Sequence, residues 1–90
     1  MQDSPHNRRK HERHPAQGSV RFFSDGLAED ISGEMLDISE SGFRASHNYP
    51  ALSGGEVVRF QHASREGRAK VVWTRIVSGR AESGFLFVPA

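Results

Sequence analysis

The apolar residues of this chain are confined to one continuous part of it. Between Gln2 and Ser19 there is no Leu, Ile, Val, Phe, Met, Trp or Tyr, whereas all 20 Leu, Ile, Val and Phe residues lie between Val20 and Val88. A segment without such side chains has no core to build and stays mobile. We therefore divide the chain into a flexible, arginine-rich arm, residues 1–19, and one small folded domain, residues 20–90.

The folded part has the pattern of six short strands. Alternating or β-branched and aromatic runs are separated by Gly, Pro, Ser and Asn, and no window repeats apolar residues at helical spacing. Six strands without covering helices leave sheet edges exposed unless the sheet closes, so we predict an all-β barrel. The expected strands are Val20–Phe23, Ile31–Ile38, Phe43–His47, Val57–Phe60, Ala69–Ile76 and Phe85–Val88.

Composition excludes several classes of protein. There is no cysteine, so neither disulfides nor thiolate-bound metal support the fold. No run approaches the ~20 apolar residues that span a bilayer. No apolar stretch follows the N-terminal charges, so we expect no membrane insertion, no secretory signal and a cytoplasmic location. The formal net charge of +1 argues against a protein that coats DNA or RNA by neutralising many phosphates. A few clustered arginines suit a small anionic ligand better.

The first candidate binding motif is Arg9-Lys10-His11-Glu12-Arg13, an Arg-x-x-x-Arg pair that Arg8 precedes. The planar arginine side chain donates two parallel hydrogen bonds to phosphate oxygens or to guanine O6 and N7, and it stacks on a base. A run of charge is more often a solvated surface, so this motif by itself does not establish a site.

The second candidate motif is Asp37-Ile38-Ser39-Glu40-Ser41-Gly42, at the end of a strand. Asp37 matches the N1–H and N2–H donors of guanine, and Ser39 can donate to phosphate. Gly42 permits a positive φ, so that the turn brings backbone N–H groups near an anion. The alternative is an ordinary hairpin turn. An upstream copy, Asp30-Ile31-Ser32-Gly33, lies seven residues earlier. That odd spacing predicts the opposite face of a regular strand, and we interpret the copy as solvent-facing polarity.

The two motifs occur together in this order, and the pair resembles the ligand-binding signature of the PilZ family. The likeness continues through Ala69-Lys70-Val71-Val72-Trp73 and Gly84-Phe85-Leu86-Phe87. It implies a six-stranded antiparallel PilZ-like β-barrel that binds the bacterial messenger cyclic di-GMP, with no other cofactor. Many family members carry a helix after the last strand, and this chain stops at Ala90, so we expect little or no C-terminal helix.

The resemblance also implies roles for individual residues. Arg9 and Arg13 hold phosphate and guanine, Asp37 and Ser39 contact the guanine and its phosphodiester, and Arg8 resembles the arrangement that binds a stacked pair of ligands. Binding is expected to order the arm across the barrel and to create a surface for a protein partner, with outputs such as motility or biofilm formation. The ligand-binding residues so assigned are Arg8, Arg9, Arg13, Asp37, Ser39 and Gly42.

Further residues bear on this interpretation and on its alternatives. Arg44 is an additional candidate for the same site, and His47 and His62 are interpreted as surface histidines. One alternative is an adaptor protein of the same fold that binds no nucleotide. A barrel that binds RNA or DNA needs exposed aromatic residues. Here six aromatic residues are assigned to the core: Phe22, Phe43, Phe60, Trp73, Phe85 and Phe87.

We predict neither a metal site nor catalysis. Three histidines lie in the arm, His6, His11 and His14, but no cysteine or fixed carboxylate accompanies them. The acidic residues show no spacing typical of a general acid/base pair, and no nucleophile motif is present.

Overall fold

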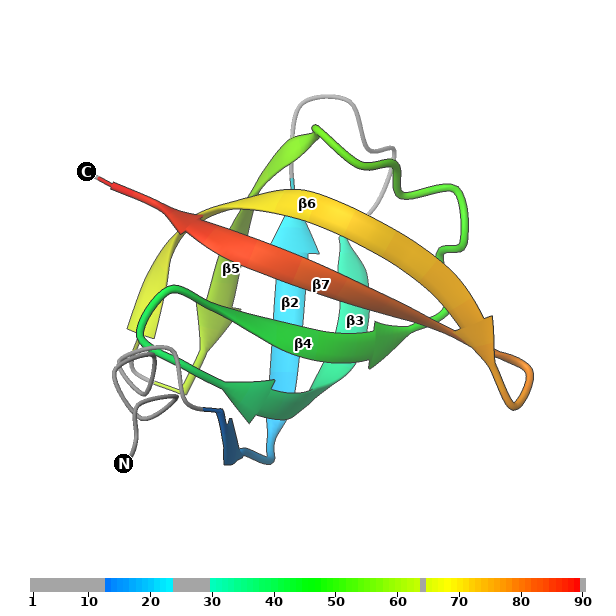
Figure 1. Cartoon of the computed structure of the whole chain (residues 1–90), viewed down its shortest axis with the longest axis horizontal. Helices are drawn as coiled ribbons and strands as arrows, with labels where there is room; N and C mark the ends of the chain where they lie inside the picture. The colour runs from blue at the N-terminus through cyan, green and yellow to red at the C-terminus, as the bar shows by residue number, and fades with distance from the viewer. Residues whose placement is uncertain (1–12, 24–29, 64, 90) are drawn as a thin grey trace, which may run out of the picture.

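The computed structural model describes residues 13–23, 30–63 and 65–89, and these residues form strands and turns without a helix. The strands are β1 (His14–Pro15), β2 (Ser19–Phe23), β3 (Ile31–Ile38), β4 (Gly42–His47), β5 (Val57–His62), β6 (Arg65–Val77) and β7 (Arg80–Val88). In the sheet, β3 pairs with β2, and the order continues through β5, β6 and β7 to β4, which pairs with β3 again and closes the barrel (Figure 1). The predicted six-stranded antiparallel barrel is confirmed.

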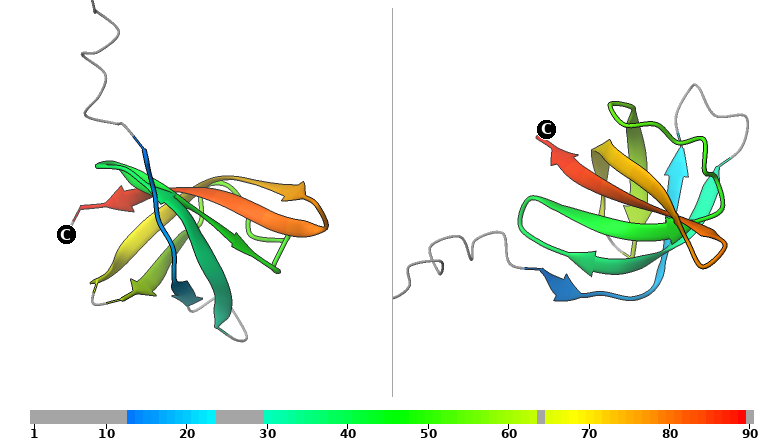
Figure 2. Two further views of the ribbon diagram at one scale, coloured as in Figure 1. Left: turned by 90° about the horizontal axis from the view of Figure 1, so that it is seen from below. Right: turned by 45° about the vertical axis from the view of Figure 1, so that its right-hand side comes forward.

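The largest differences from the predicted strand bounds are in β6 and β7, and β7 starts at Arg80 instead of Phe85. Strand β6 starts at Arg65 instead of Ala69, because its polar first residues pair with β5 from His62↔Arg65 onward although they carry no apolar alternation. Strands β6 and β7 form a long hairpin that extends beyond the barrel body (Figure 2). The two-residue strand β1 was not predicted. It lies in the segment assigned to the arm and pairs with the end of β3.

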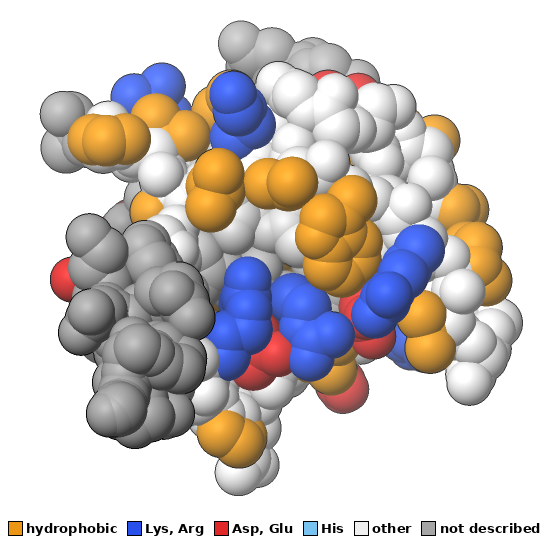
Figure 3. Space-filling model, viewed as in Figure 1, with side chains coloured by type: hydrophobic (Ala, Val, Ile, Leu, Met, Phe, Trp, Pro, Cys, Tyr) orange, Lys and Arg blue, Asp and Glu red, His pale blue; other side chains and the backbone are white. Residues whose placement is uncertain are grey.

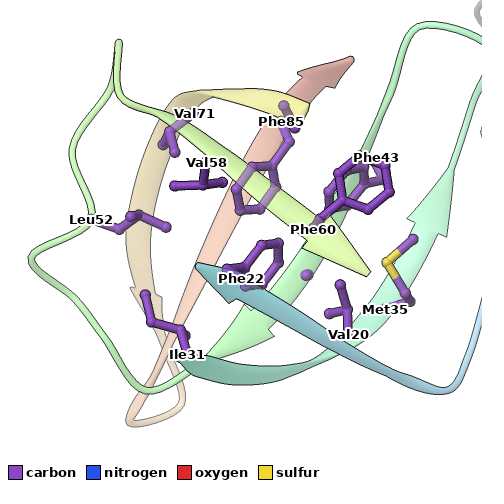
Figure 4. Packing of buried hydrophobic residues seen from close by; sticks show 12 residues of the cluster. Val20, Phe22, Ile31, Met35, Phe43, Leu52, Val58, Phe60, Val71 and Phe85 are labelled. Carbon is purple, nitrogen blue, oxygen red and sulfur yellow. The ribbon is translucent and has the colours of Figure 1, made fainter. Parts of the chain in front are cut away.

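The core is built around a stack of three phenylalanine rings. The Phe22 and Phe85 ring centroids are 4.8 Å apart and those of Phe43 and Phe85 are 4.7 Å apart, in each case nearly parallel (Figure 4). Phe60 is also buried, and Phe87 packs against the cluster. Five of the six aromatic residues assigned to the core therefore lie there. Aromatic rings of this size dominate the burial that a small barrel needs.

A β-bulge in β3 decides which residues face outward. Met35 lies opposite Ala45, but Asp37 lies opposite Arg44, so one extra residue stands between the two pairs. The side-chain alternation shifts there, and Asp37 joins Ser32 on the outer face. The prediction that the two Asp-x-Ser motifs lie on opposite faces is therefore wrong. It assumed a regular strand, and the bulge makes β3 irregular. The upstream copy is nevertheless solvent-facing as predicted: Asp30 is exposed and pairs with Arg21 at 2.9 Å.

A second bulge, in β6, moves Trp73 out of the core. Val71 lies opposite Phe85 and Trp73 lies opposite Gly84, so Val72 is the extra residue. The indole ring lies against the outside of Gly84, where a Cβ atom would be 2.5 Å from Trp73 Cε2. The assignment of Trp73 to the core is wrong, because the bulge inverts the alternation after Val71.

His47 is buried, not a surface residue as predicted. It is 0% exposed, because the inward alternation of Phe43 and Ala45 continues by one more step along β4. The Tyr49 N–H donates to His47 Nδ1 at 3.1 Å, so the proton of the neutral ring lies on Nε2 and is donated to Ser83 Oγ at 2.7 Å. Burial lowers the pKa of His47, and the nearby charge of Arg80 lowers it further.

We expect the stability of the barrel to fall as the pH drops below the ordinary histidine pKa. The unfolded chain takes up a proton at His47 below about pH 6.5, whereas the folded protein resists protonation until the pH falls further. The free energy of unfolding should therefore decrease with falling pH, with a slope of at most about 1.4 kcal/mol per pH unit from this residue. Urea unfolding between pH 7.5 and 5 measures it.

The variant that tests this pH effect is His47→Gln, which should flatten the pH dependence because the titrating group is gone. Equal slopes in the wild type and in His47→Gln would contradict the role of His47.

His62, the other histidine interpreted as a surface residue, is half-buried, with Nε2 2.9 Å from the Gln17 carbonyl.

Candidate ligand-binding site

The fold brings the second arginine of the first motif against the aspartate of the second motif. Arg13 immediately precedes β1, which pairs with β3 through Pro15↔Asp37. The Arg13 Nη1 group donates to Asp37 Oδ1 at 2.9 Å, across 24 residues of sequence. The Asp37 residue is 7% exposed. The motifs thus meet on the outer face of the barrel, while Arg8 and Arg9 lie outside the described residues.

Backbone contacts hold the segment that carries Arg13. The Ala16 N–H donates to the Leu36 carbonyl at 3.1 Å, and the Met35 N–H donates to the Gly18 carbonyl at 3.0 Å. Gly18 has a φ of 104°, a conformation that only glycine adopts easily, and it bends the chain between β1 and β2. Both short strands can therefore run along the same edge of β3.

Arg44 lies on the other side of Asp37. The bulge in β3 places Asp37 opposite Arg44. The Arg44 Nε group donates to Asp37 Oδ2 at 2.7 Å, and Nη2 contacts the same oxygen. This hydrogen bond raises the pKa of Arg44 above its ordinary value. Arg44 thus lies beside Asp37, whereas its place in a ligand-binding site remains a prediction.

The cluster continues across β7 and β6. Glu82 Oε1 accepts from Arg75 Nη2 at 3.0 Å and lies 3.5 Å from Arg44 Nη1. Basic and acidic side chains gather over this face beside a group of hydrophobic ones (Figure 3). The Arg75 guanidinium carbon is 4.9 Å from the centre of the Trp73 ring. These basic and acidic side chains alternate and are joined by ion pairs, and we call them the ionic row: Arg13, Asp37, Arg44, Glu82 and Arg75.

Ser39 organises the turn that follows Asp37. Its N–H donates to the Gly42 carbonyl at 2.7 Å, and its Oγ accepts from the N–H groups of Gly42 (3.2 Å) and Ser41 (3.3 Å). Those two N–H groups are directed at Ser39 and not at an external anion. The hydroxyl in turn donates to the Gly42 carbonyl at 3.3 Å.

Gly42 is required for a different reason than the one predicted. Among the described glycines, positive φ occurs at Gly18, Gly55 and Gly79, and not at Gly42. A Cβ atom on Gly42 would lie 1.9 Å from the Phe85 carbonyl oxygen. The expected positive φ is wrong, and the close approach of β4 to β7 explains the glycine instead.

Sequence reasoning did not identify Glu82, Arg75 or the outward position of Trp73. For Glu82 and Arg75 the sequence does contain a signal, the Ser78-Gly79 dipeptide. It forms the turn of the β6–β7 hairpin, with φ of 53° and 82°. A two-residue turn of this type sets the register of a hairpin, and that register places Arg75 opposite Glu82. The Trp73 position depends on the bulge, for which the sequence has no comparable signal.

Within the described ranges, no group of three His, Cys, Asp or Glu side chains is arranged to hold a metal ion. His14 is exposed on β1, and His6 and His11 lie outside those ranges. The part of the chain that the structure describes also has no helix long and apolar enough to cross a membrane.

Comparison with known families agrees with the geometry. The family model described as PilZ domain matches residues 7–90, nearly the whole chain. The matched range includes both motifs and all seven strands. A search of curated proteins found no match.

Proposed function

This chain belongs to the PilZ domain family, and we propose that it is a cyclic di-GMP receptor that acts by binding a ligand and not by catalysis. PilZ domains are binding and effector modules. The observation that carries the proposal is the contact between Arg13 and Asp37, one residue from each motif, on the outer face of the barrel. An arginine fork beside a carboxylate supplies donors for phosphate and an acceptor for guanine at one place.

We assign the ligand contacts to the two motifs. Arg9 and Arg13 bind phosphate and guanine, and Asp37 accepts from the guanine edge. Ser39 reaches the phosphodiester by exchanging its bond to the Gly42 carbonyl. That bond, at 3.3 Å, is long for an O–H donor, so its exchange costs little.

Ligand binding is proposed to order the part of the arm that precedes Arg13. Arg13 itself contacts the barrel through Asp37. The two phosphates of cyclic di-GMP would then draw Arg8 and Arg9 onto the same face, with Arg8 favouring a stacked pair of ligands. The ordered arm and the ligand together would form the surface that a protein partner binds.

Isothermal titration calorimetry with cyclic di-GMP tests this function. We expect saturable binding that weakens as the salt concentration rises, since the contacts are charge-assisted. A ratio near two ligands per chain would support the role of Arg8. Cyclic di-AMP is the control, because it carries the same phosphates but lacks the guanine donors, and it should bind much more weakly.

The second candidate function is an adaptor that binds no nucleotide. The observation in its favour is that arginines of the protein itself already neutralise Asp37. Absence of heat with cyclic di-GMP, together with no competition at high micromolar ligand, would establish this alternative. The protein partner would then be sought by pull-down.

A further inference from the structure

Arg44 occupies the carboxylate that the proposed ligand requires. Its Nε–H donates to Asp37 Oδ2 at 2.7 Å, and Arg13 donates to Oδ1 at 2.9 Å. The Asp37 side chain is only 10% exposed, so little of the carboxylate remains open to solvent. Both of its oxygens are therefore engaged by arginines of the protein itself.

The Arg44 guanidinium and a guanine base present similar donors to a carboxylate. Guanine carries N1–H and the N2 amino group side by side on its base-pairing edge. The guanidinium carries N–H groups on one planar fork. Arg44 directs two of its nitrogens, Nε and Nη2, at Asp37. Guanine and Arg44 consequently compete for the same acceptor.

Glu82 offers Arg44 a second acceptor on the neighbouring strand β7. Glu82 Oε1 lies 3.5 Å from Arg44 Nη1, at the outer limit of a hydrogen bond. Its side chain is 15% exposed and is also held by Arg75 at 3.0 Å. A rotation of Arg44 toward Glu82 would shorten this contact and free Asp37, so the guanidinium would keep an anionic partner throughout.

We propose that Arg44 is an internal competitor for the guanine-binding carboxylate, which it holds in the ligand-free protein and leaves for Glu82 when cyclic di-GMP binds. The inference rests on the proposed function and deepens it. It makes Arg44 a specificity-determining residue, since a ligand must pair with Asp37 better than a guanidinium does. The apparent affinity is reduced by the fraction of molecules in which Arg44 covers Asp37.

Calorimetry on single and double variants tests the competition. Arg44→Gln should bind cyclic di-GMP about three- to tenfold more tightly, because the competitor is gone. Glu82→Gln should weaken binding, since the second acceptor of Arg44 is then neutral and its hydrogen bond is no longer charge-assisted. In the Arg44→Gln background, Glu82→Gln should no longer weaken it, and this non-additivity is the signature of coupled residues.

The matched control is Arg21→Gln, which removes an arginine from another outer-face ion pair, that with Asp30 at 2.9 Å. It should leave the affinity unchanged. Weaker binding by Arg44→Gln would overturn the inference, because Arg44 would then be a ligand contact. No binding by the wild-type protein would instead overturn the proposed function, and the competition with it.

A second measurement covers the case in which a variant does not fold. In the wild-type protein, the Nε–H resonance of Arg44 reports on its bond to Asp37. Adding cyclic di-GMP should shift this resonance strongly and leave that of Arg21 in place. A resonance that does not move while the ligand saturates the protein would contradict the exchange of partners.

Discussion

Arg13→Ala will lower the affinity for cyclic di-GMP by roughly 100-fold, and Arg9→Ala will do the same. Arg13 donates to Asp37 at 2.9 Å, and in the proposed complex it supplies a charge-assisted fork to the ligand. Its loss removes the ligand contact and raises the entropy cost of ordering the arm. Calorimetry on the purified variants, with circular dichroism to verify the fold, measures the effect.

Arg21→Ala is the control for a general loss of positive charge. Arg21 forms an ion pair with Asp30 at 2.9 Å, the same distance as the pair of Arg13 with Asp37. It lies on β2, and its change should alter the affinity less than about twofold, because exposed charges interact weakly through water and salt. Equal losses in Arg21→Ala and Arg13→Ala would show that only net charge matters.

Gly42→Ala will destabilise the barrel by more than about 3 kcal/mol, a large part of the stability of a small domain. The new Cβ would lie 1.9 Å from the Phe85 carbonyl oxygen and 3.2 Å from Leu86 Cα. These are backbone atoms, which no side-chain rotation can move, so β4 must separate from β7. Urea unfolding followed by Trp73 fluorescence measures the loss.

Gly67→Ala is the matched control, since Gly67 also lies in a strand. A Cβ there would meet only the Phe60 ring, at 3.3 and 3.5 Å, and a side chain can yield. We expect a change within about 1 kcal/mol. An unfolding midpoint of Gly42→Ala equal to that of the wild type would contradict the steric explanation and leave the motif glycine with a role in ligand binding alone.

The six barrel strands were predictable because their signals are local. Alternation and turn residues within a few positions are enough to predict Ile31–Ile38, and the apolar run at Phe85–Val88 predicts the C-terminal part of β7. The same local patterns identified Phe22, Phe43 and Phe85 as core residues. They did not predict β1, because two residues, His14–Pro15, carry no periodicity.

The composition of the site was also predictable in part. Short motifs singled out Arg13 and Asp37, and the structure brings these two together. The ligand roles of all six assigned residues remain predictions: Arg8, Arg9, Arg13, Asp37, Ser39 and Gly42. The reason for Gly42 was not predictable, because the atom that a side chain would meet belongs to Phe85, which is 43 residues away in sequence.

The sequence by itself determined the strands, most of the core and the two motifs, whereas the tertiary structure decided which residues face one another. The bulges in β3 and β6 invert the alternation and put Asp37 and Trp73 on the outer face. A bulge exists only relative to a partner strand, so no pattern within one strand can reveal it. The ionic row arises in the same way, because Arg44 and Glu82 meet only when β4 pairs with β7.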